Sequence, residues 1–406
     1  MRHPVQRLAY DKAKRTVFLA AGDKIQGFDA DTGSRLQQWS TDMIPRDPSG
    51  KEQEGRPKKK SKSDSDKSER NSIRTLTCTD DGQYLVATTD EKKLLLVLST
   101  VDFSLVNNRQ FPKRPSATAI TDRGQTILLG DKFGDVYSVP IVPSVTNEEA
   151  RRGHSEVSNA ENESEYDIEP IFGHVSMLVD LIATPVVDGK RYIISGDRDE
   201  HVRVTRYPDA CIIERFCFGH EQYVSQLLIP TWSPTTLISG GGDDFLIRWK
   251  WTTGELKEKI DVKGLLYPYK QNAHEDNAET VSVAGIWEMS EFKIILVFDD
   301  SAEKLLTFQV SDDINENAKF LDMASYKLLD LAPTGENGEA WISLYDNAKD
   351  EQPLIKKIAV SSSGSINEVE SEASSNIDSE ASFNVSSRDS ILALHPVSLL
   401  RKHAEH

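Results

Sequence analysis

The sequence predicts an all-β protein built from repeated units of short antiparallel strands, and two observations support this fold class. A Gly-His pair followed by a Ser-Gly and an acidic turn occurs twice, with His174 and His220 46 residues apart and Ser195 and Ser239 44 residues apart. Short apolar runs also recur roughly every 8–12 residues with Gly- and Asp-containing turns between them. A repeat in the forties made of short strands is the signature of a WD-type β-propeller blade, and we expect seven blades.

The repeat contains side chains that can form a buried hydrogen-bonded network. A His before the inner strands, a Ser on the second strand, an Asp in the next turn and a Trp on the third strand can bond in series. The second repeat carries the full set His220, Ser239, Asp243 and Trp249. The first carries His174, Ser195 and Asp199, with Thr205 in place of the Trp. A catalytic triad is the alternative, but the G-x-S-x-G elbow of a hydrolase is absent, so a structural role is favoured.

The composition and charge argue against several classes of function. With 406 residues, 38% hydrophobic and 28% charged, the chain can bury a sizeable core. Its net charge of −17 argues against a general nucleic-acid binder. Three cysteines at irregular spacing indicate neither a disulfide framework nor a zinc site. No apolar run resembles a secretory signal or a membrane span.

The remaining strand-like runs divide into further blades of about 45 residues once polar insertions are set aside. The clearest runs are 5–10, 15–21, 36–39, 84–88, 93–98, 126–130, 281–287, 293–298, 304–310, 328–332, 339–344 and 353–360. Ring closure is expected to pair a strand from one end of the chain with a blade from the other, since this removes an exposed edge. The tail, residues 391–406, is expected to dock as a last strand or short helix.

Three polar segments are predicted to be disordered insertions. Residues 41–71 include the basic run 58–62, which is typical of a nuclear address or an RNA-tethering arm and equally of a solvated loop. Residues 145–170 carry eight acids against two arginines, and residues 361–390 carry six acids against one. Both acidic segments are rich in Ser, Asn and Glu and have little apolar surface to bury.

No motif predicts catalysis or cofactor binding. The sequence has no Walker motif, no His-x-x-x-His pair and no Cys-x-x-Cys pair. The Gly-rich run 240–242 is followed by no long amphipathic helix, so a tight β-turn is favoured over a cofactor loop. Asp197, Asp199 and Glu200 are three acids within four residues, for which turn capping is favoured over a metal site. The chain is therefore predicted to be a non-enzymatic platform that acts through its loops.

The turn one blade before the first repeat has a related sequence. The segment 130–132 aligns with 196–198, and Phe133 then stands where the network Asp is expected. An aromatic residue in an exposed turn either caps the neighbouring blade or is offered to a partner. Lys132 and Arg198 occupy matching turns, so the two cations are expected to line one continuous surface.

Four loop sequences are more specific than a generic blade. The segments DKFGDVY at 131–137, GHVSML at 173–178, DRDEH at 197–201 and SLLRKH at 398–403 resemble the non-catalytic WD-repeat subunit of the eukaryotic tRNA (guanine-N7)-methyltransferase. The polar insertions are similar to those of fungal members. The resemblance is sharp over residues 118–249 and at the tail, and elsewhere it is limited to the architecture.

The resemblance implies a heterodimer in which a separate catalytic subunit binds S-adenosylmethionine and methylates N7 of a guanine in the tRNA variable loop. It implies that the propeller has no catalytic group, stabilises and orients that subunit, meets tRNA mainly through the complex and resides chiefly in the nucleus. In the family, the Arg of the Asp-Arg-Asp-Glu turn lies at the subunit contact, and here that residue is Arg198. The position after the second Gly-His is often basic in fungal members, whereas here it is Glu221.

The residue types at this turn agree with a protein contact. Arg198 is expected to be exposed, and its planar guanidinium suits ion pairs at interfaces, although pairing only with its neighbouring acids is the alternative. The predicted contact residues are Asp131, Lys132, Phe133, Arg198, Asp199, Glu200 and His201. Two other functions stay open: a general WD-repeat scaffold such as a substrate adaptor of a ubiquitin ligase, and an enzyme with an unrecognised cofactor loop.

Overall fold

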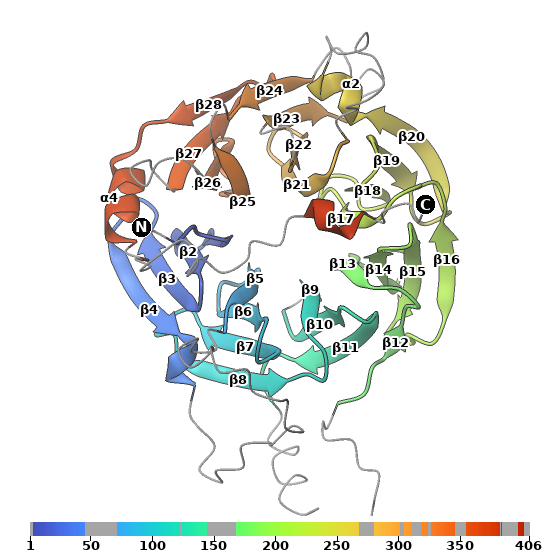
Figure 1. Ribbon diagram of the computed structural model, residues 1–406, viewed down its shortest axis with the longest axis horizontal. Helices are drawn as coiled ribbons and strands as arrows, with labels where there is room; N and C mark the ends of the chain where they lie inside the picture. Colours follow the sequence, from blue (N-terminus) through green and yellow to red (C-terminus); the bar gives the residue numbers. More distant parts are fainter. Residues whose placement is uncertain are drawn as a thin grey trace, which may run out of the picture.

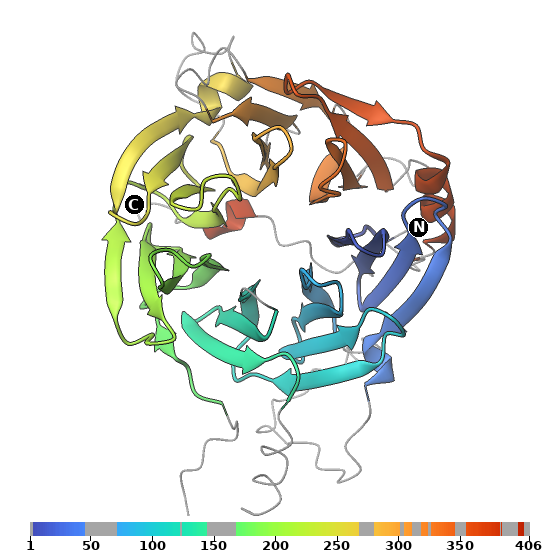
Figure 2. The same cartoon turned by 180° about the vertical axis from the view of Figure 1, so that it is seen from behind.

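Seven four-stranded antiparallel sheets stand in a ring around a central axis (Figures 1 and 2), which confirms the predicted seven-bladed propeller. The structure, a computed structural model, describes residues 3–44, 71–121, 124–143, 168–267, 280–300, 304–310, 318–323, 326–345, 355–381, 383 and 397–401. In each blade the strand that comes first in the chain lines the centre. The outermost strand of the third blade is only two residues long.

The blades follow one another along the chain. The first three consist of β1 (Arg7–Asp11), β2 (Thr16–Ala21), β3 (Lys24–Asp29) and β4 (Arg35–Ser40); β5 (Ile73–Cys78), β6 (Tyr84–Thr89), β7 (Leu94–Ser99) and β8 (Leu105–Gln110); and β9 (Pro115–Ile120), β10 (Thr126–Asp131), β11 (Asp135–Pro140) and β12 (Phe172–Gly173). The fourth and fifth consist of β13 (Leu178–Ala183), β14 (Arg191–Asp197), β15 (Val202–Tyr207) and β16 (Ile213–Cys217); and β17 (Val224–Leu228), β18 (Thr236–Gly241), β19 (Phe245–Lys250) and β20 (Glu255–Asp261). The last two consist of β21 (Val283–Met289), β22 (Ile294–Asp299), β23 (Lys304–Gln309) and β24 (Lys319–Asp322); and β25 (Lys327–Pro333), β26 (Glu339–Tyr345), β27 (Ile355–Val360) and β28 (Ile366–Val369).

In the described part of the chain, four short helical segments accompany the strands. They are η1 (Thr41–Met43), α2 (Val262–Leu266), α4 (Glu372–Glu380) and η3 (Val397–Leu400). None of the described helices is long and apolar enough to cross a membrane.

The middle strands are buried on both faces because every blade is sandwiched between two neighbours. All six residues of β2 and all six of β22 are buried. This explains why these strands appear in the sequence as continuous apolar runs and not as alternating ones. The outer strands are largely solvated, so β4 and β20 are rich in charged and amide residues. The predicted strand runs agree with the observed strands to within about two residues.

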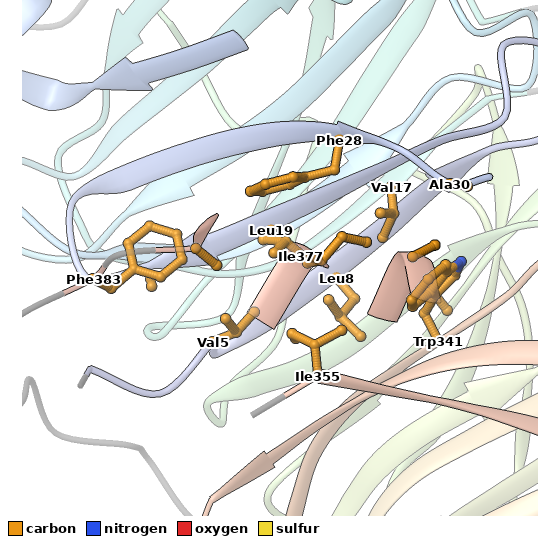
Figure 3. Close-up of a cluster of buried hydrophobic side chains, with 14 residues drawn as sticks. Val5, Leu8, Val17, Leu19, Phe28, Ala30, Trp341, Ile355, Ile377 and Phe383 are labelled. Carbon is orange, nitrogen blue, oxygen red and sulfur yellow. The ribbon is translucent and has the colours of Figure 1, made fainter. Parts of the chain in front are cut away.

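The ring closes without a shared strand, which corrects the expected closure. Every sheet formed by the described strands is contiguous in the chain, and β1 packs against β25 of the seventh blade. Across this joint the backbone N–H of Leu8 donates to Asp330 Oδ2 at 2.8 Å. Apolar packing completes the joint, with Val5 and Leu8 of the first blade beside Trp341 and Ile355 of the seventh (Figure 3). Side-chain packing therefore replaces the hydrogen-bonded ladder that was expected.

Part of the acidic segment 361–390, predicted to be disordered, is regular structure. β28 is the outer strand of the seventh blade, and α4 lies against β27. Ala373 and Ile377 of α4 and Phe383 are buried in the same cluster as the N-terminal strands (Figure 3). The composition is polar, but these few apolar residues occur at the spacing that buries one helix face. Residues 384–390 lie outside the described part of the chain.

The other two predicted insertions fall mainly on residues that the structure does not describe. In 41–71, only 41–44 and 71 are described, and the first three form η1. In 145–170, only 168–170 are described, without regular structure.

Two buried aspartates on inner strands connect neighbouring blades. Asp180 on β13 accepts the backbone N–H of Leu227 on β17 at 2.8 Å, and Asp330 makes the matching bond to Leu8. Burial raises the pKa of Asp180 to about 7 and also raises the pKa of Asp330. A β-bulge precedes each aspartate in its strand and turns the carboxylate toward the next blade. The sequence analysis did not single out these two residues.

Candidate partner-docking surface

The four side chains predicted for the fifth-blade network form one chain of hydrogen bonds. The carboxylate of Asp243 accepts from His220 Nδ1 at 2.7 Å, so His220 Nε2 is the acceptor for the Ser239 hydroxyl, also at 2.7 Å. Trp249 Nε1 donates to the same Ser239 oxygen at 2.8 Å. The second carboxylate oxygen of Asp243 accepts the backbone N–H of Glu221. The network therefore connects the entry loop to β18, to β19 and to the turn between these two strands.

This network has the bonding order of a catalytic triad but is closed to substrate. The side chains of His220 and Asp243 are 0% and 2% exposed, and Ser239 is buried beneath the indole of Trp249. A nucleophile needs an open approach for the reacting atom, and here the indole N–H occupies that approach. The geometry therefore supports a structural role, in which these hydrogen bonds hold the loop and strands of the blade together.

The fourth blade contains the equivalent network with a different aspartate, which corrects the assignment of Asp199. His174 Nδ1 donates to Asp197 Oδ2 at 3.0 Å, and its Nε2 lies 2.8 Å from Ser195 Oγ. Burial raises the pKa of Asp197, but the bonds from His174 and from the His201 backbone outweigh it, so the net pKa is lowered. Asp199 takes part in this network through its backbone N–H, which donates to Asp197 Oδ1 at 2.8 Å.

The two blades use different aspartates because they differ at the residue two positions after the network Ser. In the fourth blade this residue is Asp197, at the end of β14, whereas in the fifth blade it is Gly241. A Cβ at Gly241 would lie 1.8 Å from the carbonyl oxygen of Tyr223, so no side chain fits there. The fifth blade therefore supplies its aspartate from Asp243, two residues later.

The third blade also corrects the sequence alignment. Asp131, not position 133, corresponds to Asp197: it is 0% exposed and accepts the backbone N–H groups of Phe133 and Asp135. Burial raises its pKa above the usual value. Asp131 was predicted to be a contact residue, but a fully buried carboxylate cannot touch a partner. Its role is to hold the turn that presents Phe133 to solvent.

The turn between β14 and β15 leaves Arg198 partly exposed and bonded to Leu400, which corrects the expectation of a fully exposed side chain. The buried Asp197 accepts the backbone N–H groups of Asp199 and His201, and Glu200 between them adopts a left-handed φ of 73°. The backbone N–H of Arg198 donates to Met177 in the loop that enters the blade. Asp199, Glu200 and His201 are all partly exposed in this turn. The predicted residues 198–201 thus lie together in one turn, whose backbone is held by the buried Asp197.

An exposed aromatic cluster lies beside this turn and was missed by the sequence analysis. The rings of Phe216 and Phe218 stack with centroids 5.6 Å apart, and His201 packs edge-on against both. Phe218 is 69% exposed although it adjoins the buried end of β16. The signal in the sequence was an aromatic residue directly before the Gly-His of the next blade, where the chain is already in a loop.

The two predicted cations are connected through one loop. Gly134, in the turn that follows Lys132, accepts the backbone N–H of His174, and the same loop continues to Met177 beneath Arg198. A Cβ at Gly134 would lie 2.6 Å from the carbonyl oxygens of His174 and Ser176, and its φ is 102°, so only glycine allows this approach. The turns of the third and fourth blades therefore share one face of the ring.

The C-terminal segment docks on this face as a short helix, η3, beside β17 (Figure 1). Arg198 Nε donates to the carbonyl oxygen of Leu400 at 2.8 Å. Arg401 donates to the carbonyl oxygens of Gly242 and Val281 at 2.6 and 2.9 Å. The expected docking of the tail is therefore observed for its described residues 397–401, and it bridges the fourth, fifth and sixth blades.

Two further features bear on the alternatives considered from the sequence. Within the described ranges, no group of His, Cys, Asp and Glu is arranged to hold a metal ion. Glu221, which departs from the basic residue common in the fungal family, is 3.4 Å from Lys259 Nζ. A cation is thus present near this position, supplied by β20.

Comparison with known proteins agrees with the propeller and is specific about the family. The family model described as the tRNA methyltransferase TRM82 WD40 domain matches residues 17–164 and 146–366. A chain in the crystal structure of the mitotic checkpoint complex superimposes with a TM-score of 0.58 at 14% identity, covering 84% of this chain and 87% of that chain, and this likeness shows the fold alone.

Several curated fungal proteins are similar over most of their length, and each is named as a tRNA (guanine-N(7)-)-methyltransferase non-catalytic subunit. The Aspergillus oryzae protein is 34% identical over 76% of this chain and 75% of its own. The Meyerozyma guilliermondii and Debaryomyces hansenii proteins are 31% and 28% identical over the whole of both chains. This chain belongs to the TRM82 family of tRNA methyltransferase WD40 proteins.

Proposed function

We propose that this chain is the non-catalytic subunit of a tRNA (guanine-N7)-methyltransferase and that it binds and stabilises the catalytic subunit. The observation that carries the proposal is the surface formed by the exposed Phe218 and the partly exposed Arg198, His201 and Phe216, at the β14–β15 turn and the adjoining end of β16. We call these four residues the docking surface. Family membership supports the assignment, because the similar fungal proteins carry this name.

The composition of the docking surface is that of a protein interface. Arginine and aromatic side chains dominate binding hot spots because they give large contact areas with few rotatable bonds. A Phe that is 69% exposed costs solvation free energy in the isolated chain, and covering it recovers that energy. The turn beneath is pre-organised by Asp197, so little conformational entropy is lost on binding.

The interior of the molecule supports an accessory role. The Ser–His–Asp arrangements in the fourth and fifth blades have a structural role. In each of them the carboxylate is bonded to backbone N–H as well as to His. The proposal accordingly assigns both the methyl donor, S-adenosylmethionine, and the reacting groups to the partner subunit. The nuclear location implied by the resemblance stays a prediction.

The proposal is tested by affinity purification of the tagged chain from its native cells, followed by mass spectrometry and a binding assay with the recovered methyltransferase. We expect that subunit to co-purify, and Arg198→Ala and Phe218→Ala each to weaken the heterodimer by about 2 kcal/mol or more, the size of a hot-spot loss. The free energy of unfolding should change by less than about 0.5 kcal/mol for Phe218→Ala, an exposed position. For Arg198→Ala it should fall by about 1 kcal/mol or less, because one bond to Leu400 is lost.

Matched controls are present in the same chain. Arg206 is on the same blade at the far end of β15 and is paired with Glu214, and Phe320 is an exposed Phe on the outer strand β24. Arg206→Ala and Phe320→Ala should leave the affinity unchanged. Failure of any methyltransferase to co-purify would overturn the proposed function. Full affinity in both the Arg198 and Phe218 variants would overturn the placement of the docking surface.

A further inference from the structure

A second surface, formed by cations from five separate segments, lies over the first three blades. We call it the basic patch; its members are Arg7, Arg74, Lys93, Lys113, Arg114 and Lys132. They come from β1, from β5, from the turn after β6, and from the third blade's entry loop and its β10–β11 turn. Strands separate these segments from one another in the sequence, so the cluster exists only in the folded ring.

Hydrogen bonds and ion pairs connect four of the members, Arg7, Arg74, Arg114 and Lys132, into one continuous surface. Arg7 Nε donates to the carbonyl oxygen of Arg74 at 2.8 Å. The guanidinium groups of Arg74 and Arg114 both face Asp90 Oδ1, at 3.2 and 3.7 Å. The backbone N–H of Lys132 then donates to the carbonyl oxygen of Arg114 at 3.0 Å.

The patch carries an excess of positive charge on a chain whose net charge is −17. Described acids beside it are Asp90, whose side chain is 9% exposed, Glu91, which accepts the backbone N–H of Ser72, and Asp330, which attracts Arg7. The six cations outnumber these acids. Burial, and then repulsion from Arg114 and Arg7, lower the pKa of Arg74 despite the attraction of Asp90. The cations therefore repel one another, and a bound anion would relieve that repulsion.

An exposed aromatic ring stands in the middle of the cations. Phe133 is 55% exposed, with Lys113 Nζ 4.5 Å and Lys132 Nζ 5.3 Å from its ring centroid. The buried Asp131 holds the backbone N–H of this residue, so the ring is presented from a fixed turn. More than half of Phe133 is solvent-exposed, and two lysine side chains lie over its ring, which favours an offer to a partner over capping of the neighbouring blade.

We propose that the basic patch binds the phosphate backbone of RNA, with Phe133 as a platform for an unstacked base. Cations that follow a backbone beside an aromatic ring are the combination by which proteins hold single-stranded nucleic acid, because every base offers a π-face. An acidic peptide would satisfy the cations but would leave the ring unused. That the RNA is a tRNA rests on the proposed function. The inference assigns Lys132 and Phe133 to RNA, where the sequence suggested a protein contact.

The test measures binding of an unmodified tRNA transcript to the full-length chain and to the two-subunit complex at several salt concentrations. We expect Lys113→Glu/Lys132→Glu to weaken binding by about tenfold or more, and Lys113→Gln/Lys132→Gln to lower the salt slope by roughly 1.4–1.8, the value for two lost phosphate contacts. Phe133→Leu keeps an apolar side chain but removes the stacking face. It should weaken binding about fivefold or more and leave the slope unchanged.

The control carries the same charge change elsewhere on the ring. Lys250 and Lys319 are exposed residues of the fifth and sixth blades, and Lys250→Glu/Lys319→Glu should bind RNA like the unaltered chain. An equal loss in this control, or full RNA affinity in the patch variants, would overturn the inference. So would patch variants that keep RNA affinity but lose the catalytic subunit, since the patch would then be a protein interface. Co-purification of that subunit is measured separately, so failure of the proposed function is recognised independently.

Discussion

The fourth and fifth blades contain the same His and Ser but use their aspartates differently. In the fifth blade, Asp243 bonds His220 and the adjacent backbone, and Trp249 closes the network. In the fourth blade, Asp197 bonds two histidines and two backbone N–H groups of its own turn. The first arrangement only stabilises its blade, whereas the second also fixes the turn that presents Arg198. A shared motif thus gives one blade a closed interior and its neighbour a pre-organised surface.

The largest effect should come from removing either aspartate. Asp243→Ala leaves His220 Nδ1 and the Glu221 backbone N–H buried without partners, so we expect the free energy of unfolding to fall by about 3 kcal/mol. Asp197→Ala should cost a similar amount and, unlike Asp243→Ala, also weaken binding of the catalytic subunit. Urea denaturation and the heterodimer assay measure the two quantities, with exposed Asp209→Ala as the control. Equal partner affinity in both variants would remove the distinction between the blades.

A smaller effect concerns the pH dependence of stability, in which Asp180 and Asp197 of the fourth blade should act in opposite directions. Folding raises the pKa of Asp180 from 3.8 to about 7, so this residue stabilises the fold at low pH and its contribution is lost as the pH rises toward 7. The pKa of Asp197 is lowered, so its contribution has the opposite sign and is lost in acid.

Asp180→Asn removes the titrating group. Between about pH 4 and 7, the dependence of the free energy of unfolding on pH should change by up to about 1.4 kcal/mol per pH unit relative to the unaltered chain. Denaturation at three pH values measures this slope. The exposed Asp188→Asn serves as the control. Parallel slopes for the Asp180 variant and the unaltered chain would show that Asp180 is already ionised in the folded protein.

The smallest effect should come from the C-terminal segment, the one described element that touches the turns of both blades. Arg401→Ala removes two bonds from a partly exposed guanidinium to Gly242 and Val281, and we expect it to lower stability by about 1 kcal/mol or less. Because Arg198 bonds Leu400 in the same segment, partner affinity should fall more than stability does. Arg35→Ala, on the exposed outer strand β4, is a suitable control. Unchanged affinity would mean that Arg198 acts without the tail.

Local sequence patterns predicted most of the architecture. Strand runs such as 339–344 and 304–310 coincide with β26 and β23 because a strand buried on both faces must be a short apolar run between turns. The fifth-blade network was predictable because the sequence of that blade carries the complete His, Ser, Asp and Trp set. The network aspartate of the fourth blade was not predictable from the repeat. The fifth blade supplies its aspartate two residues later, at Asp243, because a side chain at Gly241 would clash with the backbone of Tyr223, and this contact is visible only in the structure.

By itself, the sequence determined that the chain forms a ring of blades with stapled interiors, since periodicity and hydrogen-bonding groups are local properties. The tertiary structure decided how the ring closes, through Asp330, Leu8 and the helix α4, whose apolar face is hidden in a polar composition. It also decided which side chains meet, placing Phe218 beside His201 and gathering six cations from five segments. These contacts join residues far apart in the chain, and only packing of the blades brings them together.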